Sequence, residues 1–183
     1  IMLARQGLGP GDVLAELPAP VGTGIEFVRT DLPDAPHIPA NIAYYQQKER
    51  RTRLARGPAE VETVEHLLSV CSGLKVDNLT VELSGAELPG LDGSGLEFLR
   101  LVQQSGIVEQ NAEAKVFKLD QPVYVRNGSA TLVALPTDRP ALTLQYVATF
   151  NEPGVENGSF QLDVEPETFA REMAAQGVKP ELE

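Results

Sequence analysis

The chain has 183 residues, of which 42% are hydrophobic, 22% charged and 5% aromatic, and its formal net charge is −11. This composition is too apolar for a disordered chain and too polar for an integral membrane protein. Because nucleic-acid binding needs clustered lysine and arginine, and the one basic patch is the short run from Lys48 to Arg56, we do not expect nucleic acid as a partner.

The cysteine count and the hydropathy of the chain indicate where it works. A single cysteine, Cys71, excludes an intramolecular disulfide and is typical of a reducing compartment. No stretch reaches the roughly 18 apolar residues that a membrane-spanning helix needs, and the first residues do not form a secretory signal. We therefore expect a cytoplasmic protein with no integral membrane segment and no obligate protein partner.

The first part of the chain, up to about residue 56, predicts short strands rather than long helices. Five prolines interrupt it between positions 18 and 39, and a proline inside a helix removes a backbone hydrogen bond. Residues 24–29 alternate apolar and polar side chains, which is typical of a half-buried strand.

A helix is predicted over residues 61–71, because apolar residues recur there at intervals of three and four positions. These apolar residues are Val64, Leu67, Leu68 and Cys71. At about 100° per residue, Glu65 and His66 project away from this apolar stripe. Gly73 is predicted to end the helix, since glycine tolerates the left-handed conformation of a C-terminal cap.

A strand and a second helix are predicted next. Residues 79–83 alternate apolar and polar side chains. Ser94 is the candidate N-cap of the following helix, with Glu97 at the capping-box spacing, and Gly106 is predicted to end it.

After residues 110–113 the pattern returns to strands, which we interpret as a domain boundary. Asn127 and Gly128 predict a hairpin turn, and Pro166 predicts the first turn of a further helix. The strands are predicted over residues 116–119, 123–125, 130–135, 142–150 and 160–164. This order predicts an α+β fold with two similar domains, residues 1–112 and 113–183, of which the second is incomplete.

Glu65 and His66 are the first candidates for chemistry. A zinc ligand beside a carboxylate recurs in hydrolases, because the metal lowers the pKa of bound water and the carboxylate takes its proton. A Glu-His dipeptide is also common on a solvated helix face. A catalytic zinc needs about three protein ligands. With only His37 and Cys71 besides His66, the chain cannot assemble a His/Cys site, so any further ligands would be carboxylates or come from elsewhere.

Four motifs in fixed order are more specific than this dipeptide. They are Thr-Val-Glu-His-Leu-Leu-Ser at 63–69, Gly-Leu-Lys-Val-Asp-Asn at 73–78, Glu-Leu-Pro-Gly-Leu-Asp-Gly-Ser at 87–94 and Gly-Ile-Val-Glu-Gln-Asn at 106–111. Together they resemble the UDP-3-O-acyl-N-acetylglucosamine deacetylase family, the zinc hydrolases of lipid A biosynthesis.

The resemblance implies a function and a set of roles. His66 is then a ligand of Zn²⁺, and Glu65 is the general base for a metal-activated water that removes acetate from the amide of a UDP-linked acylated glucosamine. Phe150 falls where the family places an aromatic side chain beside the uracil ring, although an ordinary strand-end core residue is an equal alternative. Each domain of the family is a sheet with a helical layer, and the two helical layers pack against each other around the zinc.

The resemblance also implies a departure. In the family, a later helix motif supplies the other two zinc ligands, whereas here residues 177–183 follow the helix that begins at Pro166. Three explanations are open: a piece of a longer protein, a degenerate relative that keeps the fold as a nucleotide-lipid binding or interaction module, or a site completed by a partner chain. We expect the first, because family-typical residues persist up to residue 176.

Two expectations follow for the chain as it stands. Its second domain should leave an apolar face uncovered around Phe160, Leu162 and Phe169. If the chain alone held zinc, carboxylates such as Glu62 would have to complete the site.

Overall fold

The computed structural model describes residues 13–139, 141–150 and 157–174. Mixed sheets and a few short helices make up the chain, so the α+β prediction is confirmed. By its internal contacts the chain divides into two compact units, residues 1–111 with 165–183, and residues 112–164. No helix among the described residues is both long and apolar enough to cross a membrane.

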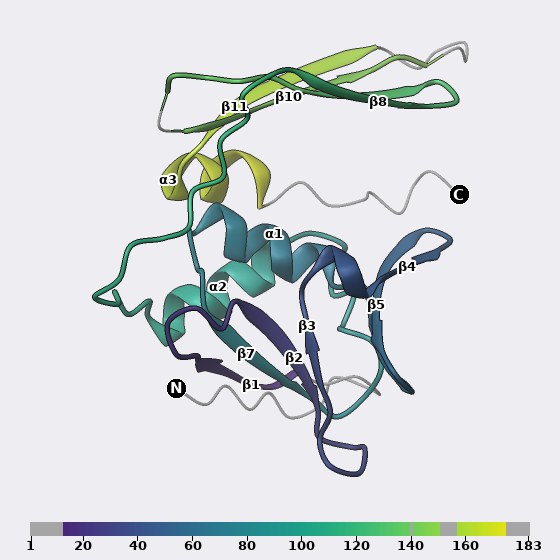
Figure 1. The fold of residues 1–183 in the computed structure, drawn as a ribbon, viewed down its shortest axis with the longest axis vertical. Coiled ribbons are helices and arrows are strands. Elements are labelled where there is room, and N and C mark those ends of the chain that lie inside the picture. The colour runs from purple at the N-terminus through teal and green to yellow at the C-terminus, as the bar shows by residue number, and fades with distance from the viewer. Residues whose placement is uncertain (1–12, 140, 151–156, 175–183) are drawn as a thin grey trace. The chain divides into compact units, whose positions relative to one another are not determined.

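A four-stranded sheet forms the base of the first unit, with strand order β1-β7-β2-β3 (Figure 1). The central pair β2 and β7 is parallel, and the two outer pairs are antiparallel. The parallel pairing is possible because a long stretch of chain, including a helix, connects β2 to β7. The strands span Val13–Pro18 (β1), Ile25–Arg29 (β2), His37–Pro39 (β3) and Leu79–Leu83 (β7).

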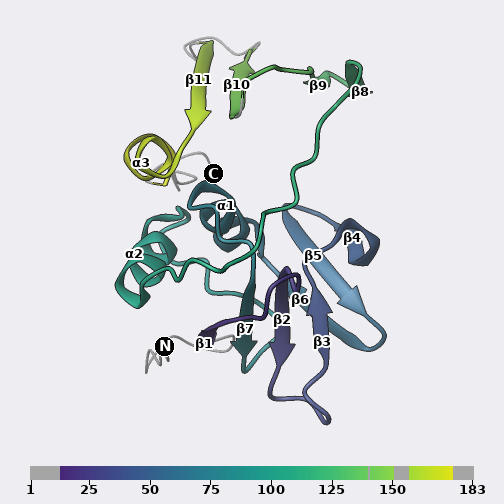
Figure 2. The same cartoon turned by 60° about the vertical axis from the view of Figure 1, so that its left-hand side comes forward.

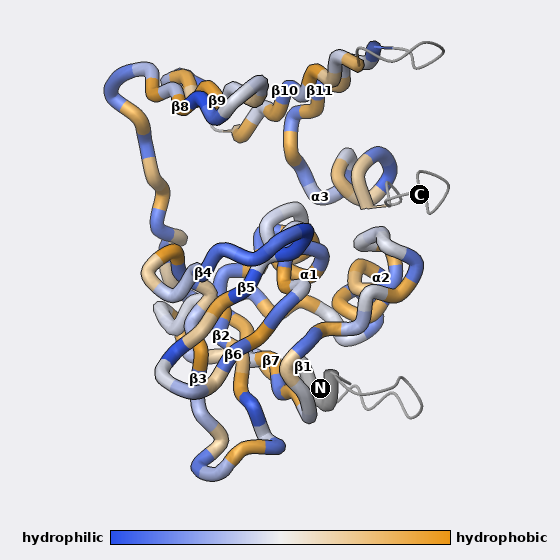
Figure 3. The backbone as a smooth tube through the Cα atoms, turned by 90° about the vertical axis from the view of Figure 1, so that its right-hand side faces the viewer, coloured by the Kyte–Doolittle hydropathy of each residue, from blue (hydrophilic) through white to orange (hydrophobic). Residues whose placement is uncertain are grey.

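A second, three-stranded antiparallel sheet follows β3 in the chain, with order β4-β5-β6. Its register places Arg53 opposite Glu62 and Leu54 opposite Val61. In Figure 3 the β4–β5 hairpin is blue, because charged and amide side chains dominate it. The strands span Tyr45–Lys48 (β4), Arg51–Arg56 (β5) and Ala59–Glu62 (β6), after a 3₁₀ turn at Ile42–Tyr44 (η1).

Two helices, α1 (Glu65–Gly73) and α2 (Leu96–Ser105), cover one face of the four-stranded sheet (Figure 2). Their apolar faces and the inward side chains of the sheet form one core of almost fully buried residues. The largest of these side chains are Phe27, Ile38, Leu67, Leu83, Leu88 and Phe98. This core fixes α1 on the sheet and thereby fixes the position of its first turn.

A short helical segment at 166–173 also belongs to the first unit. It begins with Pro166 at the first helical position, as predicted, and runs through α3 (Pro166–Thr168) into a π-helical turn, η2 (Phe169–Met173). Phe169 is 3% exposed, because its ring lies against Gly73 at the end of α1. The prediction of an uncovered apolar face is therefore wrong for Phe169 and for Leu162, which is 5% exposed. Phe160 is exposed as predicted, at 36%.

The second unit consists of two separate antiparallel hairpins. The turn at Gly128, with φ of 58°, joins β8 to β9 and confirms the predicted hairpin. The predicted strand at 116–119 does not form, and Phe117 in it is 88% exposed. The strands span Val123–Asn127 (β8), Ala130–Ala134 (β9), Leu142–Ala148 (β10) and Gly158–Val164 (β11).

Three predicted details of the first unit need correction. Val61 belongs to β6 and pairs with Leu54, so the helix begins at Glu65 and not at residue 61. Gly73 does not have a left-handed backbone; the positive φ after α1 belongs to Lys75, at 58°.

The third correction concerns the start of α2. Its N-cap is Gly95, one residue later than predicted, although the Ser94 hydroxyl still accepts a hydrogen bond from the Leu96 N–H at 3.1 Å. In a capping box, the N–H of Ser94 would donate to the Glu97 side chain. Here it donates instead to Asp92 Oδ1, at 2.9 Å.

Candidate functional site

Glu65 and His66 are the first two residues of α1, and both are partly exposed. The Glu65 carboxylate accepts a hydrogen bond at Oε2 from the backbone N–H of Thr52 on β5, at 3.2 Å. A carboxylate in the first helical turn is also favoured by the positive end of the helix dipole. The structure therefore brings the predicted pair together on one turn and holds the carboxylate against a neighbouring strand.

The chain reaches this turn through a left-handed residue. Thr63, between β6 and α1, has φ of 59°. A β-branched residue rarely adopts this conformation, which costs about 1–3 kcal/mol. Two hydrogen bonds hold it: the Thr63 N–H donates to the Thr52 carbonyl at 3.0 Å, and the Thr63 hydroxyl donates to Glu87 Oε1 at 2.7 Å.

Glu87 is itself fixed by the backbone around it. The N–H of Glu62 donates to the Ala86 carbonyl at 2.8 Å, and the N–H of Leu88 donates to the Glu62 carbonyl at 3.1 Å. Leu88 is 1% exposed and anchors this segment in the core. The segment therefore runs beside the end of β6 and presents Glu87 to the turn.

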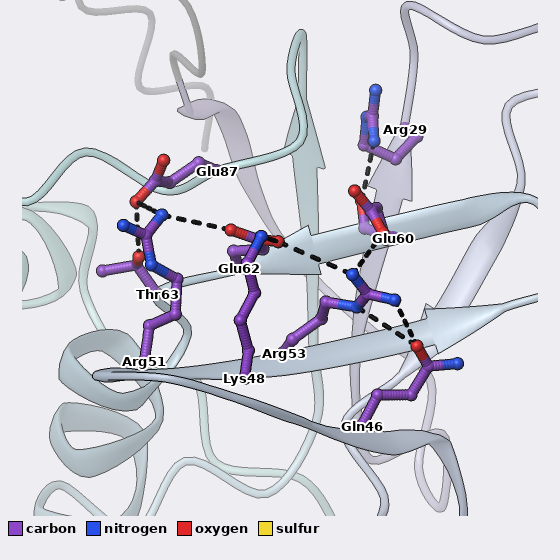
Figure 4. Close-up of polar contacts among 9 residues, drawn as sticks. All are labelled: Arg29, Gln46, Lys48, Arg51, Arg53, Glu60, Glu62, Thr63 and Glu87. Atoms are coloured by element: carbon purple, nitrogen blue, oxygen red, sulfur yellow. Dashed lines mark hydrogen bonds and ion pairs between the residues drawn. The ribbon is translucent and has the colours of Figure 1, made fainter.

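A network of charged side chains surrounds the same turn (Figure 4). Glu62, whose side chain is 7% exposed, pairs with Lys48 and accepts a hydrogen bond from Arg51 Nη1 at 3.1 Å. Arg51 also bonds Glu87 Oε1 at 2.9 Å, so its guanidinium bridges the two carboxylates. The pKa of Glu62 lies below its ordinary value of 4.5, chiefly because Lys48 donates to the carboxylate and Arg51 adds a second hydrogen bond.

The described residues do not by themselves fit a catalytic zinc ion. Within residues 13–139, 141–150 and 157–174, no three His, Cys, Asp or Glu side chains gather as a metal-binding group. Cys71 is fully buried, and His37 Nδ1 lies 3.0 Å from Glu26 Oε2. Glu62 is engaged by Lys48 and Arg51 and cannot serve as the extra carboxylate. His66 is therefore a candidate for one ligand of a set that these residues leave incomplete.

Phe150 follows β10 in the second unit and is 50% exposed. Its backbone N–H donates to Asn157 Oδ1 at 2.8 Å, which fixes the strand end. Its ring shares this exposure with the other large apolar side chains of β8 to β10, among them Tyr124 and Tyr146.

Sequence reasoning missed three residues of this site. Thr52 contributes backbone atoms alone, so its side chain carries no signal. Thr63 and Glu87 lie in motifs that the sequence analysis singled out, but no periodicity relates them, since 24 positions separate the hydroxyl from its acceptor.

The sequence that forms this turn matches a known protein family. The family model described as UDP-3-O-acyl N-acetylglycosamine deacetylase matches residues 11–176. The chain belongs to this family. Glu65, His66, Thr63 and Glu87 all fall within the matched range, and so does Phe150.

Curated relatives of the chain bear the name of the same enzyme. UDP-3-O-acyl-N-acetylglucosamine deacetylase of a Nostoc species is 38% identical over 86% of the chain and 58% of the relative. The proteins of that name from an Anaeromyxobacter species and from Xanthomonas campestris pv. campestris are 37% and 39% identical, over 91% and 90% of the chain and 53% and 54% of the relatives. The chain thus spans about half the length of the curated relatives it matches.

Proposed function

We propose that this chain is part of a zinc-dependent UDP-3-O-acyl-N-acetylglucosamine deacetylase that acts in the cytoplasm in lipid A biosynthesis. The observation that carries the proposal is the Glu65 carboxylate, which the Thr52 N–H holds at the start of α1, one residue before His66. Membership of the family and the printed names of the relatives support the substrate class.

Glu65 acts as the general base in this proposal. It takes a proton from the water that attacks the acetamide carbonyl, and the hydrogen bond at Oε2 orients its carboxylate for that transfer. His66 supplies one ligand of Zn²⁺, and the others come from outside the described residues. The metal, when bound, polarises the carbonyl and lowers the pKa of water.

The fold proposal keeps two similar domains, residues 1–112 and an incomplete 113–183, that meet through their helical layers. Residues 165–183 group with residues 1–111 by their contacts, and Phe169 packs on Gly73. This supports contact between a helix of the proposed second domain and a helix of the first. In this arrangement Phe150 contributes to substrate binding by stacking on the uracil ring, and its 50% exposure supports that role.

Acetate release by the complete protein tests the general base. Glu65→Gln should lower turnover by about 10²-fold or more, the usual contribution of a general base, and should leave the bound zinc per protein unchanged. Glu60→Gln is the matched control, because Glu60 lies on the adjacent β6 and pairs only with Arg53 among the ion pairs of the described residues. It should retain normal turnover.

Two outcomes would reject the proposal. Unchanged turnover in Glu65→Gln would remove Glu65 from the reaction. Binding of the UDP-linked substrate without acetate release by the complete wild-type protein would favour the non-catalytic binding module instead.

A further inference from the structure

The turn between β6 and α1 stores strain directly before the candidate catalytic pair. Six non-glycine residues in the described part of the chain have positive φ, and Thr63 is the β-branched one among them. Strain of this kind persists only where the surroundings over-determine the backbone, and it clusters at functional sites. Thr63 precedes Glu65 by two positions, so its φ sets the direction in which α1 leaves the sheet.

The contacts around Thr63 form a continuous path to Glu65. The Thr63 hydroxyl donates a hydrogen bond to Glu87 Oε1 at 2.7 Å, and the Thr63 N–H donates to the Thr52 carbonyl at 3.0 Å. The N–H of the same Thr52 donates to Glu65 Oε2 at 3.2 Å. One residue of β5 therefore holds the strained turn through its carbonyl and the candidate base through its N–H.

Glu87 is suited to hold this path because its backbone neighbours and its carboxylate are all hydrogen-bonded. Backbone hydrogen bonds tie residues 86 and 88, on either side of it, to Glu62. Arg51 Nη1 donates to Glu87 Oε1 at 2.9 Å. In Figure 4 the Arg51 guanidinium and the Thr63 side chain converge on Glu87 from one side.

We infer that Glu87 is a positioning residue, which acts through the Thr63 hydroxyl to fix the left-handed turn and thereby aligns Glu65 and His66. The inference rests on the proposed function for its kinetic consequences, but the alignment itself is a property of the turn. Glu87 takes no part in proton transfer in this assignment.

Kinetics and NMR on the complete protein test the inference together. Glu87→Ala and Thr63→Val should each lower kcat by about tenfold to a hundredfold, the usual cost of a misplaced group, with KM within about threefold of wild type. Glu87→Gln and Thr63→Ser keep an acceptor and a donor, respectively, and should restore most of the activity. Glu60→Ala removes a glutamate of similar exposure from the neighbouring pair with Arg53 and should change neither parameter.

The NMR measurement separates this inference from the proposed function. In Glu87→Ala and Thr63→Val, the amide resonance of residue 52 and the φ-dependent coupling of residue 63 should change, and in Glu60→Ala they should not. Unchanged resonances and kinetics in Glu87→Ala would overturn the positioning role. If Glu65→Gln left turnover intact while the resonances moved, the positioning of the turn would stand and the deacetylase proposal would fail. Should Glu87→Ala not fold, the Thr63→Val and Thr63→Ser pair gives the same decision.

Discussion

At the scale of single residues, the missing side chain of Gly73 lets an aromatic ring lie against α1. A Cβ atom built on Gly73 would lie 2.2 Å from Cγ of Phe169, far inside van der Waals contact. The backbone of Gly73 is ordinary helix, so close approach, rather than a turn, requires glycine here.

Gly73→Ala should therefore destabilise the protein, although the same change in an exposed helix stabilises it. We expect a loss of about 1–3 kcal/mol in the free energy of unfolding, because the new methyl group overpacks the Phe169 contact. Urea unfolding measures this loss. Ser72→Ala, on the exposed side of the same helix, is the control and should stay within about 0.5 kcal/mol of wild type.

A double variant identifies the cause. Phe169→Leu frees space over Gly73 and should recover part of the loss when combined with Gly73→Ala. If the two changes in unfolding free energy simply added, the Phe169 ring would not be the group that excludes a side chain at position 73.

At the scale of elements, ion pairs link the three strands of the β4-β5-β6 sheet around a buried carboxylate. Glu62 on β6 is paired with Lys48 on β4 and Arg51 on β5. Because the folded-state pKa of Glu62 is lowered, its contribution to stability is complete above its ordinary pKa of 4.5 and is lost as the pH falls through the lowered value.

Lys48→Met should cost about 1–2 kcal/mol of unfolding free energy at pH 7, since it removes a charge-assisted hydrogen bond from a buried acceptor. The difference in unfolding free energy between Lys48→Met and wild type should become smaller below pH 4.5, because Glu62 becomes protonated in both proteins. Urea unfolding across this pH range is the measurement. Lys75→Met, which breaks an exposed pair with Glu165, should change stability by less than about 0.5 kcal/mol. If the loss of unfolding free energy in Lys48→Met did not vary with pH, the ionised Glu62 carboxylate would not be the partner that Lys48 stabilises.

The elements that could be predicted from sequence are those whose chemistry is local. Gly128 and Pro166 each define a turn or a helix start by their own backbone preferences, and both formed where predicted. Val61 fits a helical period, yet its backbone pairs with Leu54, and a pairing between strands is not encoded in periodicity. Residues 116–119 are mostly apolar, which predicts a strand, but they remain irregular.

The candidate site divides in the same way. Glu65 and His66 could be named as candidates because they lie together in a motif that resembles a known family, on a helix that the apolar period predicts. The conformation of Thr63 could not, because threonine disfavours it and the groups that impose it belong to Thr52 and Glu87, which only the folded chain brings near.

At the scale of the whole molecule, the first compact unit draws on two distant parts of the sequence, residues 1–111 and 165–183. The connection depends on Phe169, which is 3% exposed and belongs to the main core. The Lys75–Glu165 pair joins the same two parts at the surface.

A chain that ends at Val164 should accordingly be less stable than one that ends at Ala174. The expected loss in the first unit is about 2–3 kcal/mol, the value of burying one phenylalanine side chain. Amide hydrogen exchange along α1 measures it, and the faster exchange should be greatest near Gly73. Equal protection of α1 in the two chains would show that Phe169 adds nothing to the unit.

The hydrogen bond from Thr52 to Glu65 has a consequence for how this family is compared. Its donor is a main-chain amide, which nineteen of the twenty amino acids supply and only proline lacks. Any residue other than proline at position 52 can therefore donate this hydrogen bond. A comparison of residue identities alone would not reveal the contact. The candidate base can thus keep this partner without any constraint on the side chain that accompanies it.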